Sequence, residues 1–204
     1  MSVYLSFVLT SVLLALTPGP DVLLVVMIAA KEGFKKALKL TLGLASGVIF
    51  HTLLIVLGFS AIIVASSVAM KLIALFGAIY LLYLAWVTWV HRKDGISPVD
   101  SKQIKGSYYW RGVIMNVSNP KVLLFFLALF PQFAQLSQPG YHWRIVILGS
   151  LFIGVTVIVF GGLAYLAAKS TQNFIQSPRF KLAMDNATVV VFVVLAVLLA
   201  YSII

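Results

Sequence analysis

The chain has no cysteine, only five acidic residues and three histidines, and charged residues make up 10% of its 204 positions. The absence of cysteine excludes thiol-based electron relays and cysteine metal sites. So few acids and histidines do not assemble the metal or Ser/His/Asp sets that intramembrane enzymes need. The scarcity of charge also excludes a soluble domain of this length, because such a domain needs a polar shell. We therefore expect no enzyme, no metal site and no cofactor.

Hydrophobic residues make up 62% of the sequence and form long runs. Each run is long enough to cross a hydrocarbon core of ~30 Å as a helix of ~20 residues. The runs are continuously apolar, whereas barrel strands alternate apolar and polar residues. The sequence therefore predicts an all-α integral membrane protein with six transmembrane helices. These lie near residues 4–30, 40–66, 72–90, 112–133, 145–168 and 182–204.

The basic residues indicate how these helices are oriented. The first, third and fifth connections hold Lys31, Lys35, Lys36, Lys39, Arg92, Lys93, Lys102, Lys105, Arg111, Lys169, Arg179 and Lys181. The second and fourth connections hold only Lys71 and Arg144. Because cytoplasmic loops carry the excess of Lys and Arg, we predict that both termini face the periplasm or cell exterior. The same pattern argues against nucleic-acid binding.

The two halves of the chain share a short pattern at one equivalent place. Residues 20–24 read PDVLL and residues 120–124 read PKVLL, and each block follows a short polar group in the first span of its half. With three spans in each half, the second half starts from the opposite side of the membrane. We therefore predict an inverted repeat within one transporter domain, 1–204. Repeat 1 covers about 1–90, a cytoplasmic loop about 91–111, and repeat 2 about 112–204.

Proline should break the first and fourth helices at these blocks, because it removes a backbone donor and clashes with the preceding turn. A new half-helix can then start, with Thr17 or Asn119 as its N-cap and Pro18 or Pro120 in its first turn. Its N-terminal amides would point toward mid-membrane and favour a carboxylate. Paired broken helices at matching points of two repeats indicate a transporter's substrate site.

An ionisable residue of opposite sign follows each break. Asp21 and Lys121 would each cost ~2.5–3.5 kcal/mol at a helix centre, so an ion pair between them is expected. Prolines also kink membrane helices for packing alone. Two matched breaks, each followed by a charge, favour a functional site.

Five motifs across the chain have a pattern in common with a known family. They are Thr17-Pro18-Gly19-Pro20-Asp21, Gly43-x-x-x-Gly47-x-x-x-His51, Gly77-Ala78-Ile79-Tyr80-Leu81-Leu82-Tyr83-Leu84, Asn116-x-x-Asn119-Pro120-Lys121 and Phe130-Pro131-Gln132-Phe133. With the length and the six-span pattern, they resemble the lysine exporter superfamily, and more closely its homoserine/threonine exporter branch (LysE/RhtB). The resemblance implies export of amino acids or close derivatives across the bacterial inner membrane, driven by the proton motive force.

The expected site centres on the two proline motifs. Asp21 either binds substrate, carries a proton or holds Lys121, and His51 is either a packing residue or a second proton carrier. The expected substrate-binding residues are Thr17, Pro18, Gly19, Pro20, Asp21, Asn116, Asn119, Pro120, Lys121 and Tyr80; the candidates for proton coupling are Asp21 and His51.

Two further pairs have structural explanations. Lys181 and Asp185 are spaced to form an i,i+4 ion pair near a span end. Gly43 and Gly47 form a small-xxx-small pair that permits close contact with a second helix, either in the same chain or in another subunit.

The sequence thus predicts a secondary active exporter of neutral amino acids or close derivatives, such as homoserine, threonine or leucine, coupled to protons. Its partners would be this small substrate and the lipid bilayer. The sequence leaves open whether the chain forms a homo-oligomer. The alternatives are an exporter of another small solute or a metal ion, or a membrane scaffold subunit that transports nothing.

Overall fold

The computed structural model describes residues 2–17, 19–59, 67–92, 106–136, 138–169 and 177–201, and every element in these ranges is helical. The predicted all-α class is therefore confirmed. The α-helices are α1 (Ser2–Leu16), α2 (Pro20–Glu32), α3 (Phe34–Leu54), α5 (Ser67–His91), α6 (Tyr108–Val117), α7 (Pro120–Leu124), α8 (Phe130–Ala134), α9 (Tyr141–Lys169) and α11 (Pro178–Tyr201). Two π-helical turns, η1 (Ile55–Phe59) and η3 (Phe125–Leu129), follow α3 and α7.

Four of the helical stretches are long and apolar enough to cross a membrane alone. They are Phe34–Leu57, Lys71–His91, Tyr141–Lys169 and Lys181–Tyr201. Two more candidates are bent pairs: Val3–Leu16 with Pro20–Glu32, bent by 63°, and Tyr108–Val117 with Pro120–Ala134, bent by 47°. Counting each bent pair as one span gives six spans, with breaks in the first and the fourth as predicted.

The second half of the fourth span departs from a regular α-helix. It runs through α7, the π-turn η3 and α8. Pro131 has no N–H to bond the carbonyl of Leu127, so the helix loses one regular bond there. The π-turn ends at Leu129, just before this proline, where a wider turn is compatible with the missing donor.

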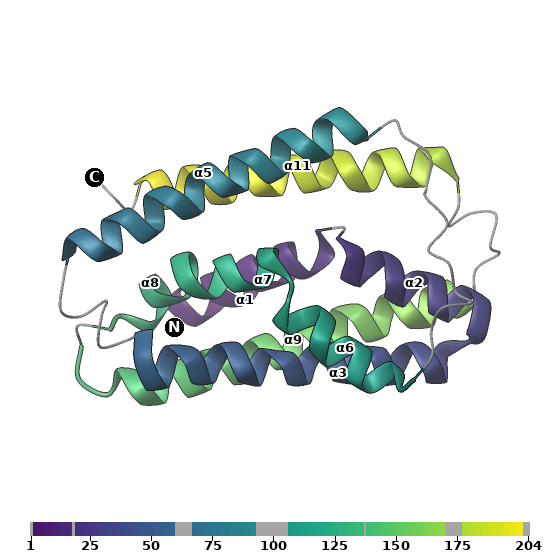
Figure 1. Ribbon diagram of the computed structural model, residues 1–204, viewed down its shortest axis with the longest axis horizontal. Coiled ribbons are helices and arrows are strands. Elements are labelled where there is room, and N and C mark those ends of the chain that lie inside the picture. The colour runs from purple at the N-terminus through teal and green to yellow at the C-terminus, as the bar shows by residue number, and fades with distance from the viewer. Residues whose placement is uncertain are drawn as a thin grey trace.

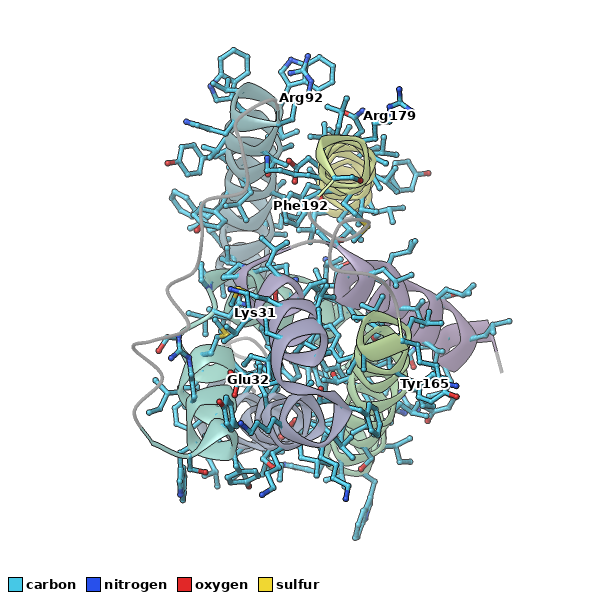
Figure 2. The ribbon with its side chains drawn as sticks, turned by 90° about the vertical axis from the view of Figure 1, so that its right-hand side faces the viewer. Lys31, Glu32, Arg92, Tyr165, Arg179 and Phe192 are labelled. Atoms are coloured by element: carbon cyan, nitrogen blue, oxygen red, sulfur yellow. The ribbon has the colours of Figure 1, made fainter. Side chains whose placement is uncertain are left out.

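The two chain ends lie at one end of the molecule, and the basic connections lie at the other. Figure 1 shows the N and C labels at the left, while the α2–α3 corner and the ends of α5 and α9 lie at the right. Figure 2 looks onto that right-hand end, where Lys31, Arg92 and Arg179 are labelled. An even number of crossings produces this separation. Lys93, Lys102 and Lys105 lie outside the described residues.

Helices α5 and α11 form an antiparallel pair above the remaining helices (Figure 1). The Lys181 ammonium donates to the His91 carbonyl at 3.2 Å and so joins the end of α5 to the start of α11. Lys181 also pairs with Asp185 at 2.7 Å, as the i,i+4 spacing predicted. The pair rests on η3 through α5, where a Cβ on Gly77 would lie 2.6 Å from the Cβ of Ala128.

The remaining helices of each half of the chain pack against helices of the other half. The second span, α3, packs against α6 of the other half, and the fifth span, α9, packs against α1 and α2 of the first half. Helices α3 and α9 also pack against each other. Each broken span is therefore supported by the second span of the opposite half.

Glycine permits the closest of these helix contacts. A Cβ on Gly43 would lie 2.0 Å from the Tyr109 carbonyl oxygen, and one on Gly112 would lie 2.3 Å from the Leu40 carbonyl oxygen. A Cβ on Gly47 would lie 2.6 Å from the Cβ of Asn116. The small-xxx-small pair of α3 thus meets α6 of its own chain.

The distribution of polarity is that of a membrane protein. Ile158 on α9 is 75% exposed, whereas Asp21 and Lys121 are 2% and 5% exposed. Behind this apolar surface, Phe7 contacts the rings of Phe125, Phe130, Phe133 and Phe152 at centroid distances of 5.3 to 6.4 Å. This aromatic cluster joins α1 to the fourth span and α9.

The α3–α6 contact predicts a position-specific effect of one methyl group. Gly43→Ala and Gly112→Ala place a Cβ against backbone that cannot move locally, so each should lower the free energy of unfolding by ~1–3 kcal/mol. Gly154→Ala on α9 is the matched control, since a Cβ there meets no described atom within 4 Å. Thermal unfolding in detergent measures the difference. Equal effects at all three positions would contradict the described contact.

Candidate functional site

The first break separates α1 from α2 at Thr17 to Gly19. Pro18 and Pro20 lack the N–H groups that would bond the carbonyls of Leu14 and Leu16 in a continuous helix. The Thr17 hydroxyl donates backwards to the Leu13 carbonyl at 2.7 Å, and Gly19 is the residue that precedes α2. The prediction that Thr17 caps the second half-helix is therefore wrong, because its hydroxyl bonds to its own preceding turn. Pro18 lies outside the described residues.

The second break separates α6 from α7. The Asn119 side chain accepts from the Lys121 amide at 3.0 Å and Pro120 occupies the first turn, so the predicted cap is confirmed. Pro120 lacks the N–H that would bond the Asn116 carbonyl. That carbonyl instead accepts from the Asn119 amide at 3.0 Å and lies 3.2 Å from Nε2 of His51. Because a carbonyl can only accept, Nε2 carries the hydrogen.

Lys121 joins the two breaks. Its Nζ lies 3.3 Å from the Leu14 carbonyl oxygen and 3.0 Å from the Thr17 carbonyl oxygen, at the end of α1. It also lies 3.3 Å from Oδ2 and 3.4 Å from Oδ1 of Asp21. An ammonium has three donors, and these two carbonyls and one carboxylate occupy all three. The predicted ion pair is present, and Lys121 in addition caps the carbonyl end of α1.

The positions of both charges match the helix dipoles. Asp21 lies in the first turn of α2, near its positive end, and Lys121 lies at the negative end of α1. Gly19 allows this close approach, since a Cβ there would lie 2.6 Å from Oδ1 of Asp21 and 3.3 Å from Nζ of Lys121. Any larger residue at position 19 would displace the pair.

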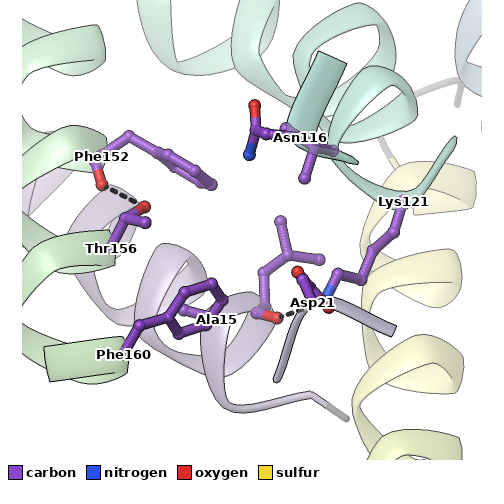
Figure 3. A pocket seen from close by; sticks show the side chains of 9 residues that line it. Ala15, Asp21, Asn116, Lys121, Phe152, Thr156 and Phe160 are labelled. Atoms are coloured by element: carbon purple, nitrogen blue, oxygen red, sulfur yellow. Dashed lines mark hydrogen bonds and ion pairs between the residues drawn. The ribbon is translucent and has the colours of Figure 1, made fainter. Parts of the chain in front are cut away.

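A small cavity lies beside the ion pair (Figure 3). Its volume is about 10 Å³. This is room for about one water molecule. Asp21 and Lys121 line one side and Asn116 another, and α9 contributes Phe152, Thr156 and Phe160 across from the charges. An amino acid does not fit this volume, so the helices around it must separate before a solute of that size enters.

The lining by α9 is a feature that the sequence does not predict. Phe152, Thr156 and Phe160 are spaced by four residues and therefore lie along one helix face. Their helix is apolar all round, so its periodicity does not distinguish the face that lines a cavity from the face that meets lipid. Only the packing of α9 against α1 and α2 identifies it.

The other predicted residues lie at different distances from this cavity. His51 is 1% exposed, stacks on Phe126 with a ring separation of 5.3 Å, and contacts the site through the Asn116 carbonyl. Tyr80 lies on α5 beside Tyr83 and is not among the residues that line the described cavity. Pro20 and Pro120 are exposed at the first positions of their helices.

Some buried polar atoms at the site lack a hydrogen-bond partner in the described part of the chain. Among them are Oδ1 of Asn116, Nδ1 of His51 and Nδ2 of Asn119. A buried polar atom without a partner is costly, and it commonly marks a place where a water or ligand binds. All three atoms belong to residues at or next to the second break.

Comparison with known proteins agrees with this architecture. Residues 12–203 match the family described as LysE type translocator. The chain is 30% identical to the homoserine/homoserine lactone efflux protein of Salmonella typhi, over 97% of this chain and 95% of that protein. It is also 30% identical to an uncharacterized membrane protein of Vibrio cholerae, over 90% of this chain and 89% of that protein. No solved structure matches the chain.

The buried pair predicts strong coupling between its two members. Asp21→Asn and Lys121→Met each leave one buried charge unpaired, and each should lower the free energy of unfolding by ~3–5 kcal/mol. The double variant removes both charges, so it should lose clearly less than the sum of the single losses. Thermal or denaturant unfolding in detergent measures the cycle.

The control is the Lys181–Asp185 pair, whose side chains are 18% and 17% exposed, changed to Met and Asn in the same way. Its coupling should be below ~1 kcal/mol, as for surface pairs. Additive losses at Asp21 and Lys121 would mean that the two charges do not interact.

Proposed function

This chain belongs to the LysE type translocator family, and we propose that it exports a neutral amino acid or a close derivative across the bacterial inner membrane. It is a multi-pass membrane transporter and not an enzyme. The substrate class is supported by two relatives, from Salmonella typhi and Salmonella typhimurium, each 30% identical and each named for efflux of homoserine and homoserine lactone.

One observation carries the proposal: the site already holds a primary ammonium. The carbonyls of Leu14 and Thr17 and the carboxylate of Asp21 surround Nζ of Lys121 at 3.0 to 3.4 Å. A substrate ammonium has the same charge and the same three donors. It would replace Lys121 in this cage, and the Lys121 side chain would move aside.

The substrate carboxylate then requires positive potential. The released Lys121 ammonium supplies it directly, and the N-terminal amides of α2 add to it, because anions are favoured at the start of a helix. A zwitterion leaves the net charge of the site unchanged. A cationic substrate would bring an additional charge into the membrane interior, which is costly.

The proposed alternating access is based on the packing of each half of the chain against helices of the other half. In our proposal the chain is a pair of inverted repeats, about 1–90 and 112–204, joined by a cytoplasmic loop at about 91–111. This is supported by α3 packing on α6 and α9 packing on α1 and α2. Rocking one half against the other would open the cavity alternately to each side. The basic end would face the cytoplasm and both termini the periplasm.

Two groups are candidates for proton coupling. Protonation of Asp21 would remove the carboxylate from the ammonium cage and weaken its hold on substrate or Lys121. Nδ1 of His51 has no partner in the described part of the chain, so it can accept a proton without breaking an existing bond. A charge on His51 would then act on the second break through the Asn116 carbonyl.

Transport by purified protein in proteoliposomes tests the proposal. The wild type should move labelled homoserine against its gradient when a pH gradient is imposed. Asp21→Asn and Lys121→Ala should lose at least ~90% of net export, because loss of a charged hydrogen bond of ~1.5–3 kcal/mol costs about a factor of ten or more. Insertion and detergent extraction should stay normal.

Asp185→Asn is the matched control, since it makes the same chemical change in an ion pair away from the cavity. It should transport as the wild type does. Normal net export by both Asp21→Asn and Lys121→Ala would contradict the proposed site. Flux that does not depend on the pH gradient would contradict proton coupling but not the proposed binding site.

A further inference from the structure

The side of the cavity opposite the ion pair has a chemistry of its own. Figure 3 shows Phe152, Thr156 and Phe160 of α9 facing the cavity from the side away from Asp21 and Lys121, with Asn116 next to them. If the charged groups hold the ammonium and carboxylate of an amino acid, its side chain extends toward this wall. The inference therefore rests on the proposed function.

The polar atoms of this wall are one acceptor, on Thr156, and one donor, on Asn116. The Thr156 hydroxyl donates its only hydrogen to the Phe152 carbonyl at 2.8 Å, so its oxygen retains only acceptor capacity. Figure 3 shows the amide nitrogen of Asn116 on the cavity side, whereas Oδ1 lies toward Gly47 of α3, so Asn116 presents a donor to the cavity. A solute that enters here is favoured when it brings a group that both donates and accepts hydrogen bonds, as a hydroxyl does.

The apolar part of the wall limits size. Phe152 and Phe160 stand one turn before and one turn after Thr156, and both are 3% exposed. Phe152 is fixed by ring contacts to Phe125 at 5.1 Å and Phe126 at 5.4 Å. A short side chain reaches Thr156 between the two rings, whereas a long or branched one meets them.

We propose that Thr156 and Asn116, framed by Phe152 and Phe160, form the side-chain subsite and select short side chains that end in a group able to donate to Thr156 and to accept from Asn116, such as a hydroxyl. Thr156 is then the residue that distinguishes a hydroxylated amino acid from its apolar isostere. A site built to bond a substrate hydroxyl discriminates against an analogue that lacks it, because the polar groups of the site are left unpaired.

The test compares homoserine with norvaline, in which a methyl group replaces the hydroxyl. Each is offered as an unlabelled competitor of labelled homoserine export in proteoliposomes. The wild type should prefer homoserine, and Thr156→Val should reduce that preference about tenfold, as expected for one lost hydrogen bond. Thr156→Ser keeps the oxygen and should restore the preference, which a purely structural role of the methyl group would not do.

Thr188→Val is the matched control. Thr188 is 0% exposed and donates to the Met184 carbonyl at 2.9 Å in the same i−4 pattern, but it lies on α11 and does not line the cavity. This variant should keep the wild-type preference. Protein amount and unfolding temperature are recorded for all three variants.

The outcomes separate this inference from the proposed function. If Thr156→Val keeps the wild-type preference for homoserine over norvaline while export still depends on Asp21 and Lys121, the side-chain subsite is overturned. The proposed exporter function is then unaffected. Equal loss of preference in Thr188→Val would also overturn it. Failure of the wild type to export or bind any amino acid would overturn both proposals.

Discussion

At each break, proline removes the regular helical partner of a backbone carbonyl, and the hydrocarbon of the membrane offers no bulk water to replace that partner. Pro18 lacks the N–H that would bond the Leu14 carbonyl, and Pro120 lacks the one that would bond the Asn116 carbonyl, which accepts from the Asn119 amide instead. A side chain from another helix approaches each carbonyl: Lys121 in the first case and His51 in the second. The helices that carry these side chains therefore contribute to the stability of both breaks.

This requirement explains the residues around the breaks. Lys121 brings a charge that Asp21 must balance, and Gly19 makes room for both. On α3, Gly43, Gly47 and His51 are spaced by four residues, so one helix face meets the α6 backbone, the Asn116 side chain and the Asn116 carbonyl in turn. The face that holds the helices together therefore also holds the polar groups of the cavity.

The sequence predicts the features that rest on local chemistry. Prolines, flanking polar residues and charge counts are enough to identify the two breaks, the Asn119 cap and the Asp21–Lys121 pair. The Thr17 cap is wrongly predicted because a threonine hydroxyl can bond forwards or backwards, and only geometry decides between the two. The Phe152–Thr156–Phe160 wall is not predicted, because the sequence of a uniformly apolar helix does not distinguish the face that lines the cavity from the face that meets lipid. The partner of Gly43 likewise depends on long-range packing.

The central claim is that the Lys121 ammonium occupies the substrate's ammonium position when the carrier is empty. Net efflux requires the empty carrier to return across the membrane, whereas exchange of homoserine for homoserine keeps the site occupied in both directions. The most direct test is to measure both processes in proteoliposomes with Lys121→Ala. The account predicts that net efflux is lost while exchange persists at saturating homoserine, with a weaker apparent affinity because Lys121 no longer faces the substrate carboxylate. Loss of both at saturating homoserine in a correctly inserted protein would contradict it, because the occupied carrier would then need Lys121 as much as the empty one.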